Sequence, residues 1–117
     1  MASKVASKSF LTLKIREGSQ KVRLHGSSFR VGRAPQCELA IDGPRVSRVH
    51  ARLVLEGTQW FVEDLDSANG VFLNGRKIDY AELHPGDLLE FGVRGPQVEV
   101  RDLAPQTRLR LETETEF

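Results

Sequence analysis

A short polar stretch, residues 44–50, contains four side chains that could do chemistry. It places Arg45, Ser47, Arg48 and His50 within six positions. A serine and a histidine in one segment can act as nucleophile and base. Two arginines can bind a nucleic-acid backbone, and the whole set can form a pocket for one compact anion. The segment therefore leaves three functions open: catalysis, nucleic-acid binding and recognition of a single anion.

The distribution of charge favours a small anion over a polyanion. The 117 residues carry a net charge of only +1. Residues 22–52 contain six arginines and two acids, whereas residues 53–102 contain ten acids and four basic residues. A protein that grips many phosphates of a duplex needs a sustained basic surface. This chain has a local basic stretch on an acidic body, and its twelve arginines against five lysines suit bidentate contacts to oxyanions.

Catalysis and metal binding lack the residues that they need. Ser47 lies in no G-x-S-x-G motif, and no third member or oxyanion loop accompanies the pair Ser47 and His50. Cys37 is the only cysteine, which excludes an internal disulfide and a cysteine-built zinc site. We therefore expect a protein that is not an enzyme and that uses no metal and no cofactor.

Apolar and polar residues alternate along most of the chain, which predicts strands rather than helices. The alternation occupies seven short segments: 11–15, 22–24, 29–31, 51–55, 60–62, 88–90 and 98–100. Turn residues bound each segment. Asn74-Gly75 separates the short segments 71–73 and 76–78 and predicts a type I′ hairpin, because both central residues of that turn need positive φ. Many short strands at this spacing predict an all-β fold, an antiparallel sandwich or barrel.

The length fits one domain with a single modest core. Residues 1–9 are expected to form an N-terminal extension, 10–103 the β domain, and 104–117 a C-terminal tail or linker stub. No apolar run reaches the length of a membrane span, and residues 1–10 lack the apolar core of a secretory signal. The expected location is the cytoplasm.

Four motifs follow one another at a spacing that is typical of a known family. They are Gly32-Arg33, Ser47-Arg48-Val49-His50, Asn69-Gly70 and Asn74-Gly75. In this order they resemble the forkhead-associated (FHA) domain, a module that binds phosphothreonine. The segments FVEDLDSANGVFLNGRKI and LHPGDLLEFG are similar to that family too, so the resemblance covers roughly residues 10–102. It implies a β-sandwich of about eleven strands that binds a phosphopeptide on loops at one end, without catalysis.

The resemblance implies a role for five binding residues. Arg33 would pair with the phosphate, Ser47 would donate its hydroxyl to it, and Arg48 would supply a second positive charge. Asn69 would bond the peptide backbone beside the phosphothreonine. Arg45 would face the peptide on its C-terminal side, where a guanidinium favours an acid three residues after the phosphothreonine. A phosphate that is close to dianionic at pH 7, with three strong acceptor oxygens, suits this set of donors.

Five further residues are expected to have structural roles. Gly32, Gly70, Asn74 and Gly75 would shape turns, and the ring of His50 would brace the loop that carries Ser47. The implied partner is a phosphothreonine-containing protein or peptide, which in turn implies an upstream Ser/Thr kinase. Neither nucleic acid nor a membrane is expected to bind, and the chain is expected to be a monomer.

One position departs from the family pattern. The residue before the first Asn-Gly is usually Thr or Ser, whose hydroxyl also reaches the phosphopeptide, and here it is Ala68. A hydrogen bond to a charged group contributes about 1.5–3 kcal/mol, so its loss predicts binding that is roughly ten- to hundredfold weaker. The alternative is an FHA-like domain that serves protein–protein contact with weak or lost phosphate binding. The acidic tail adds one hypothesis: Thr113, with Glu116 three residues on, could itself be a ligand if phosphorylated.

Overall fold

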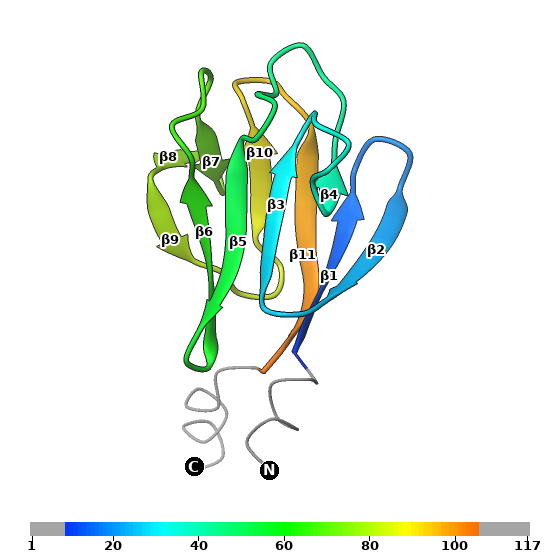
Figure 1. Ribbon diagram of the computed structural model, residues 1–117, viewed down its shortest axis with the longest axis vertical. Helices are drawn as coiled ribbons and strands as arrows, with labels where there is room; N and C mark the ends of the chain where they lie inside the picture. Colours follow the sequence, from blue (N-terminus) through cyan, green and yellow to red (C-terminus); the bar gives the residue numbers. More distant parts are fainter. Residues whose placement is uncertain (1–8, 106–117) are drawn as a thin grey trace.

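Two packed β-sheets form the whole of the described chain. The structure, a computed structural model, describes residues 9–105 and contains no helix among them. The eleven strands are β1 (Phe10–Ile15), β2 (Gln20–His25), β3 (Ser28–Gly32), β4 (Leu39–Ala40), β5 (Ala51–Glu56), β6 (Gln59–Asp64), β7 (Val71–Leu73), β8 (Arg76–Ile78), β9 (Tyr80–Glu82), β10 (Leu88–Phe91) and β11 (Gln97–Ala104). They form a sandwich (Figure 1), which confirms the predicted fold class.

The two sheets meet over a core of alternating apolar side chains. One sheet has the order β2-β1-β11-β10-β7-β8, and the other has the order β4-β3-β5-β6-β9. Trp60 of β6 is almost fully buried and stacks on Phe29 with 5.7 Å between ring centroids. Its indole Nε1 donates a hydrogen bond to the carbonyl oxygen of Ala104 at 3.0 Å. Because Ala104 belongs to β11, this bond ties the two sheets together while satisfying a buried donor.

The predicted hairpin is confirmed, whereas two strands were not predicted. Asn74 and Gly75 have φ angles of 52° and 86°, so both central residues adopt the positive φ that a type I′ turn requires. β4 has only two residues and pairs with β3 in parallel, and β9 has three. Segments this short show no alternation from which a strand could be predicted.

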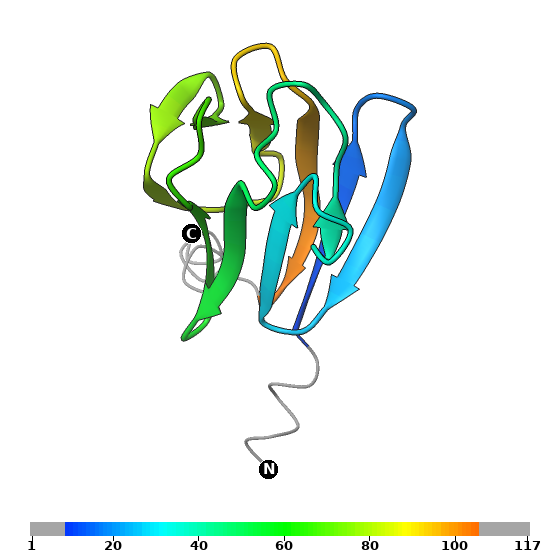
Figure 2. The same cartoon turned by 45° about the horizontal axis from the view of Figure 1, so that its top comes forward.

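Four connections gather at one end of the sandwich. The β3–β4, β4–β5, β6–β7 and β10–β11 loops lie together there, next to the β1–β2 turn (Figures 1 and 2). Phe10, at the start of β1, pairs with Ala104, at the end of β11, so both ends of the described chain lie at the opposite end of the domain. The loops therefore lie at the end of the sandwich opposite to the two ends of the described chain.

The division into extension, domain and tail stays a prediction. The residues on either side of 9–105, including Thr113, lie outside the described residues. Within 9–105 no helix is long and apolar enough to cross a membrane.

Candidate functional site

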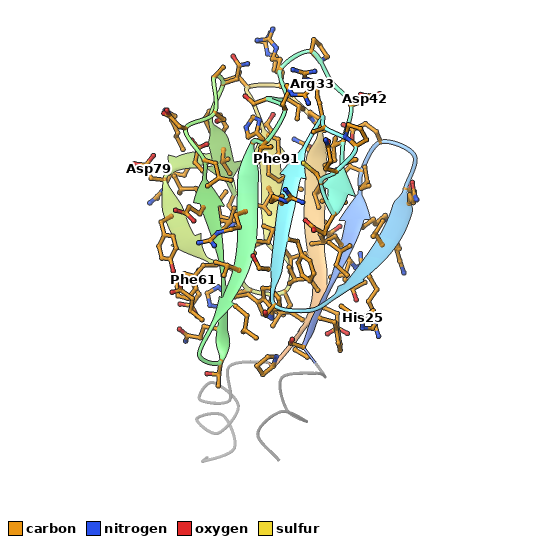
Figure 3. All side chains as sticks on the ribbon, in the orientation of Figure 1. His25, Arg33, Asp42, Phe61, Asp79 and Phe91 are labelled. Atoms are coloured by element: carbon orange, nitrogen blue, oxygen red, sulfur yellow. The ribbon has the colours of Figure 1, made fainter. Side chains whose placement is uncertain are left out.

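At the centre of the candidate site lies a fully buried histidine, His50, directly before β5. Its Nδ1 accepts a hydrogen bond from the backbone N–H of Ser47 at 3.0 Å. Nε2 therefore carries the ring proton and donates it to the carbonyl oxygen of Gly70 at 2.7 Å. The carbonyl oxygen of His50 accepts from the N–H of Leu65 at 3.0 Å, and the His50 ring meets the ring of Phe91 edge-on. Phe91 lies inside the sandwich (Figure 3). One residue thus joins the β4–β5 loop to the β6–β7 loop.

The end of β3 lies directly against the β4–β5 loop. The backbone N–H of Arg33 donates to the carbonyl oxygen of Ser47 at 3.0 Å, and that of Ala34 donates to Arg48 at 3.0 Å. Gly32 permits this close approach, because a Cβ built there would lie 2.2 Å from the carbonyl oxygen of Arg48. Any side chain at position 32 would push the two segments apart. The absence of a side chain at Gly32 therefore allows the backbones of Arg33 and Ser47 to lie next to each other.

Arg33 is exposed and its guanidinium is held from one side only. Nε donates to the carbonyl oxygen of Val46 at 2.6 Å. Asp42 lines the same hollow of about 420 Å³ at the loop end of the molecule (Figure 3), yet no carboxylate of residues 9–105 forms an ion pair with Arg33. The anchored Nε fixes the plane of the guanidinium, and its two Nη groups are left available for an anion.

Ser47 and Asn69 link neighbouring loops and keep unused hydrogen-bonding capacity. The Oγ of Ser47 accepts a hydrogen bond from the backbone N–H of Ala68 at 3.2 Å, which leaves its own proton free to be donated. The Nδ2 of Asn69 donates to the carbonyl oxygen of Arg45 at 3.1 Å, which leaves its amide oxygen as an acceptor. Both side chains are therefore positioned by the protein and still able to bind a ligand.

Arg45 and Arg48 add two exposed cations to the same loops. Across residues 9–105, neither side chain has a carboxylate within ion-pair distance, as is also true of Arg33. Four arginines elsewhere in the described chain do have such partners, namely Arg23, Arg30, Arg52 and Arg101; Arg52, for example, contacts Glu63 at 2.9 Å on the outer face of the second sheet. The β3–β4 and β4–β5 loops therefore carry three guanidiniums whose charge is not neutralised within the described chain.

Glu38 attaches the β3–β4 loop to β3. The backbone N–H of Arg30 donates to its Oε1 at 2.8 Å, and this hydrogen bond is the main reason that the pKa of Glu38 lies below its usual value. On the same sheet, the hydroxyl of Tyr80 donates to Glu56 at 2.6 Å, which raises the pKa of Tyr80 to about 12. Both contacts attach loop or edge segments to the sheet outside the candidate site.

The structure also assigns positioning roles to residues that sequence reasoning missed. In the β6–β7 loop, Asp64 accepts from the N–H of Ser67, and Ser67 Oγ accepts from the N–H of Gly70 at 2.9 Å. Gly92 has a φ of 91°, and a Cβ there would lie 2.8 Å from the Cβ of Arg45. The spacing of Asp64, Ser67 and Gly70 could have predicted two successive side-chain-capped turns. The need for glycine at position 92 has no such local signature.

The five predicted binding residues come together from three segments. They are Arg33 after β3, Arg45, Ser47 and Arg48 before β5, and Asn69 before β7. The Asn74-Gly75 turn lies apart from them, between β7 and β8. The ligand contacts of these residues remain predictions.

A family model described as the FHA domain matches residues 29–92, more than half of the chain. The chain belongs to the FHA family. Its FHA domain is 39% identical over 61 residues to the glycogen accumulation regulator GarA of Mycolicibacterium smegmatis, an alignment that covers 52% of this chain and 39% of GarA. It is 36% identical over 78 residues to the ABC transporter ATP-binding/permease protein Rv1747 of Mycobacterium tuberculosis, covering 67% of this chain and 9% of that protein. The matched FHA segment is thus less than half of either relative.

Solved structures agree with the FHA assignment. Mycobacterium tuberculosis EmbR, in complex with a low affinity phosphopeptide, superposes with a TM-score of 0.73 at 26% identity, covering 83% of this chain and 25% of EmbR. The FHA loops of the present chain therefore lie on the same scaffold as those of a protein with a bound phosphopeptide.

Replacement of His50 tests whether its ring holds the β4–β5 and β6–β7 loops together. His50→Ala removes the partners of the Ser47 N–H and the Gly70 carbonyl and leaves a cavity, so we expect a loss of about 2–4 kcal/mol in unfolding free energy. Urea denaturation measures it. His25→Ala, which removes an exposed ring, is the matched control and should cost less than about 0.5 kcal/mol. An unchanged stability of His50→Ala together with lost phosphopeptide binding would place His50 in the ligand contact instead.

Proposed function

We propose that this FHA domain is a non-catalytic module that binds a phosphothreonine-containing protein or peptide, produced in the cytoplasm by a Ser/Thr kinase. The observation that carries the proposal is the state of Arg33. Its Nε is fixed on Val46, its Nη groups are unpaired within the described chain, and it lies beside the segment that presents Ser47. A guanidinium held in this way has lost part of its conformational freedom before any ligand arrives, which lowers the cost of binding an anion.

The donor set suits one phosphate group. A phosphate with three acceptor oxygens and a charge close to −2 can accept from the Nη groups of Arg33 and from the hydroxyl of Ser47. Arg48 supplies further positive charge on the same loop, and the free amide oxygen of Asn69 can accept from a peptide N–H. EmbR, whose structure is a complex with a low affinity phosphopeptide, supports the same class of ligand for the present chain.

The nucleophile–base interpretation fails on geometry. The ring of His50 bonds the backbone N–H of Ser47 rather than its hydroxyl, and its other nitrogen is bound to Gly70. With both nitrogens occupied and no exposed surface, the ring cannot take a proton from the Oγ of Ser47.

A long polyanion would meet acidic residues directly beside the site. A hollow below the β6–β7 loop is lined by Glu63, Asp64, Asp66 and Asp79, with Lys77 as its one cation. Phosphates that continued past the arginines would be repelled there, because like charges close together raise the free energy of binding. This arrangement supports a single phosphorylated residue over a nucleic acid.

Ala68 is the residue that supports the alternative of weak or lost phosphate binding. Its backbone N–H is used on Ser47, and its methyl group offers no donor. A domain that no longer bound phosphate would have no need to keep Arg33 unpaired. The unpaired Arg33 favours a module that binds phosphothreonine, with an affinity reduced by the missing hydroxyl.

Removal of Arg33 is the direct test of the proposed function. Isothermal titration of a phosphothreonine peptide library should show that Arg33→Ala weakens binding by at least about 100-fold, because two charged hydrogen bonds are lost. Ser47→Ala should cost about tenfold, since a neutral hydroxyl is the weaker donor. Thermal stability should change little, because Arg33 is exposed.

Arg30→Ala provides the control for Arg33→Ala. Arg30 is exposed on the same strand, but its guanidinium faces Glu38 on the outer surface. Binding should be unaffected by this change. Equal binding by Arg33→Ala and the parent chain would show that Arg33 does not contact the phosphate.

Ala68→Thr should strengthen phosphothreonine binding. A hydroxyl at this position restores the donor that the family pattern has, and a gain of about tenfold is expected from one added hydrogen bond to a charged group. Ala68→Val has the same shape without the hydroxyl and should show no gain. If both variants bind like the parent, another group has replaced this contact.

Arg45 is proposed to select an acid three residues after the phosphothreonine. Paired peptides with Glu or Ala at that place should differ about two- to fivefold, the range of an exposed ion pair. Arg45→Ala should abolish this preference, whereas Arg48→Ala should weaken both peptides and keep it. A preference that survives Arg45→Ala would assign it to another residue.

A further inference from the structure

A second hollow adjoins the proposed phosphate site at the loop end of the domain. It lies between the end of β1 with the β1–β2 turn, the start of the β4–β5 loop, and the β10–β11 loop. The hollow measures about 360 Å³, a size within the range of about 300–1,000 Å³ that is typical of ligand sites. It shares Ala40, Ile41 and Asp42 with the hollow that Arg33 lines (Figure 3). The two hollows are therefore neighbouring parts of one surface.

The charges that line this second hollow balance one another, and the other side chains in the lining are apolar. Two carboxylates and two guanidiniums belong to it, those of Glu17, Asp42, Arg45 and Arg94. Among residues 9–105 none of the four forms an ion pair. A charged side chain that entered would meet repulsion as well as attraction and would lose hydration. A neutral side chain loses no such hydration and gains from apolar contact with Ile15, Ala40, Ile41, Pro44 and Pro96.

The wall of the hollow formed by the β10–β11 loop is fixed by backbone hydrogen bonds. The N–H of Gly92 donates to the carbonyl oxygen of Gly70, and the N–H of Gly95 donates to that of Gly92, both at 2.9 Å. The N–H of Arg94 donates to the carboxylate of Glu90 at 2.9 Å. These contacts hold Arg94 at a φ of 63°, which residues other than glycine rarely adopt. Little further ordering of this wall is needed when a ligand binds.

Arg45 relates the hollow to a position in the bound peptide. Its side chain lines the hollow, and its carbonyl oxygen accepts the hydrogen bond from Asn69. The same guanidinium is proposed above to contact an acid three residues after the phosphothreonine. In an extended peptide, side chains two residues apart point to the same side and lie about 6.6–6.8 Å apart. The side chain five residues after the phosphothreonine would therefore follow the acid into the hollow.

We propose that this hollow binds a large apolar side chain of the partner peptide at the fifth position after the phosphothreonine. The inference rests on the proposed function, including the role of Arg45. The occupant is the phosphopeptide itself, because the hollow continues from the residues assigned to the phosphate and to the acid. Leucine has three more carbon atoms than alanine, and their partial burial is expected to raise the affinity about five- to tenfold.

A peptide series measures this selectivity directly. All peptides carry phosphothreonine and a glutamate three residues later, and they differ only in leucine, alanine, glutamate or lysine at the fifth position. In isothermal titration with the full chain, the leucine peptide should bind about five- to tenfold more tightly than the alanine peptide. The glutamate and lysine peptides should bind no more tightly than the alanine peptide. Equal affinity for leucine and alanine, or tightest binding of a charged peptide, would overturn the inference.

Filling the hollow should remove the advantage of leucine. Ile15→Trp adds bulk from the end of β1, at a residue that does not line the hollow beside Arg33. The leucine peptide should then bind like the alanine peptide, whose own affinity should stay unchanged. Leu24→Trp is the matched control, because Leu24 is also half-buried but pairs with Leu11 near the other end of the same sheet. A leucine advantage that survives Ile15→Trp would show that the side chain binds elsewhere.

Isoleucine methyl signals locate the side chain without any substitution in the domain. The chain has three isoleucines. Ile15 and Ile41 line the hollow, whereas Ile78 belongs to β8. Exchanging the alanine peptide for the leucine peptide should shift the methyl signals of Ile15 and Ile41 and leave that of Ile78 in place. Unchanged signals of Ile15 and Ile41 would overturn the inference, as would shifts that follow chain concentration alone, since a second copy would then fill the hollow.

The inference and the proposed function fail in different ways. If phosphopeptides bind through Arg33 with one affinity whatever the fifth residue is, the inference is wrong and the proposed function stands. If no phosphopeptide binds, both are wrong. The unphosphorylated leucine peptide should show no measurable binding, and binding as tight as that of its phosphorylated form would contradict both.

Discussion

The two hydrogen bonds of the His50 ring are the constraint on which the binding end of this domain depends. The ring has no exposed surface, and each nitrogen bonds a different loop: Nδ1 the N–H of Ser47, and Nε2 the carbonyl of Gly70. The Gly70 carbonyl also accepts the N–H of Gly92 at 2.9 Å, which attaches the β10–β11 loop to the same point. Three loops from both sheets are therefore held together by one buried group, and a buried imidazole without these partners would be costly.

The polar side chains of the site hold the loops with only part of their hydrogen-bonding capacity. Their bonds to backbone amides and carbonyls leave the Nη groups of Arg33, the hydroxyl proton of Ser47 and the amide oxygen of Asn69 unused. Within the described chain no carboxylate forms an ion pair with Arg33, Arg45 or Arg48, while Arg30 and Arg52 on the outer face have carboxylate partners. Unpaired cations on a rigid frame favour an anion, because little further ordering is needed when it binds.

Strand alternation and turn residues predicted most of the fold, because each strand buries one face in a common core. β4 could not be predicted, because a strand of two residues is too short to show an alternation of apolar and polar residues. For the site, the family motifs predicted which residues take part, and the structure showed the contacts between them. The carbonyl of Val46 that anchors Arg33 could not be predicted, since every residue has a carbonyl. Nor could the reason for Gly32, where close approach of the Arg48 backbone, and not a turn, excludes a side chain.

The most direct measurement is a structure of this chain with a bound phosphothreonine peptide. The account predicts phosphate oxygens within about 3.2 Å of the Nη groups of Arg33 and the Oγ of Ser47. It also predicts that both bonds of the His50 ring persist and that the loop backbone moves by less than about 1 Å, as in other preorganised sites. A phosphate bound away from Arg33, or loops that rearrange so that His50 leaves Gly70, would contradict it.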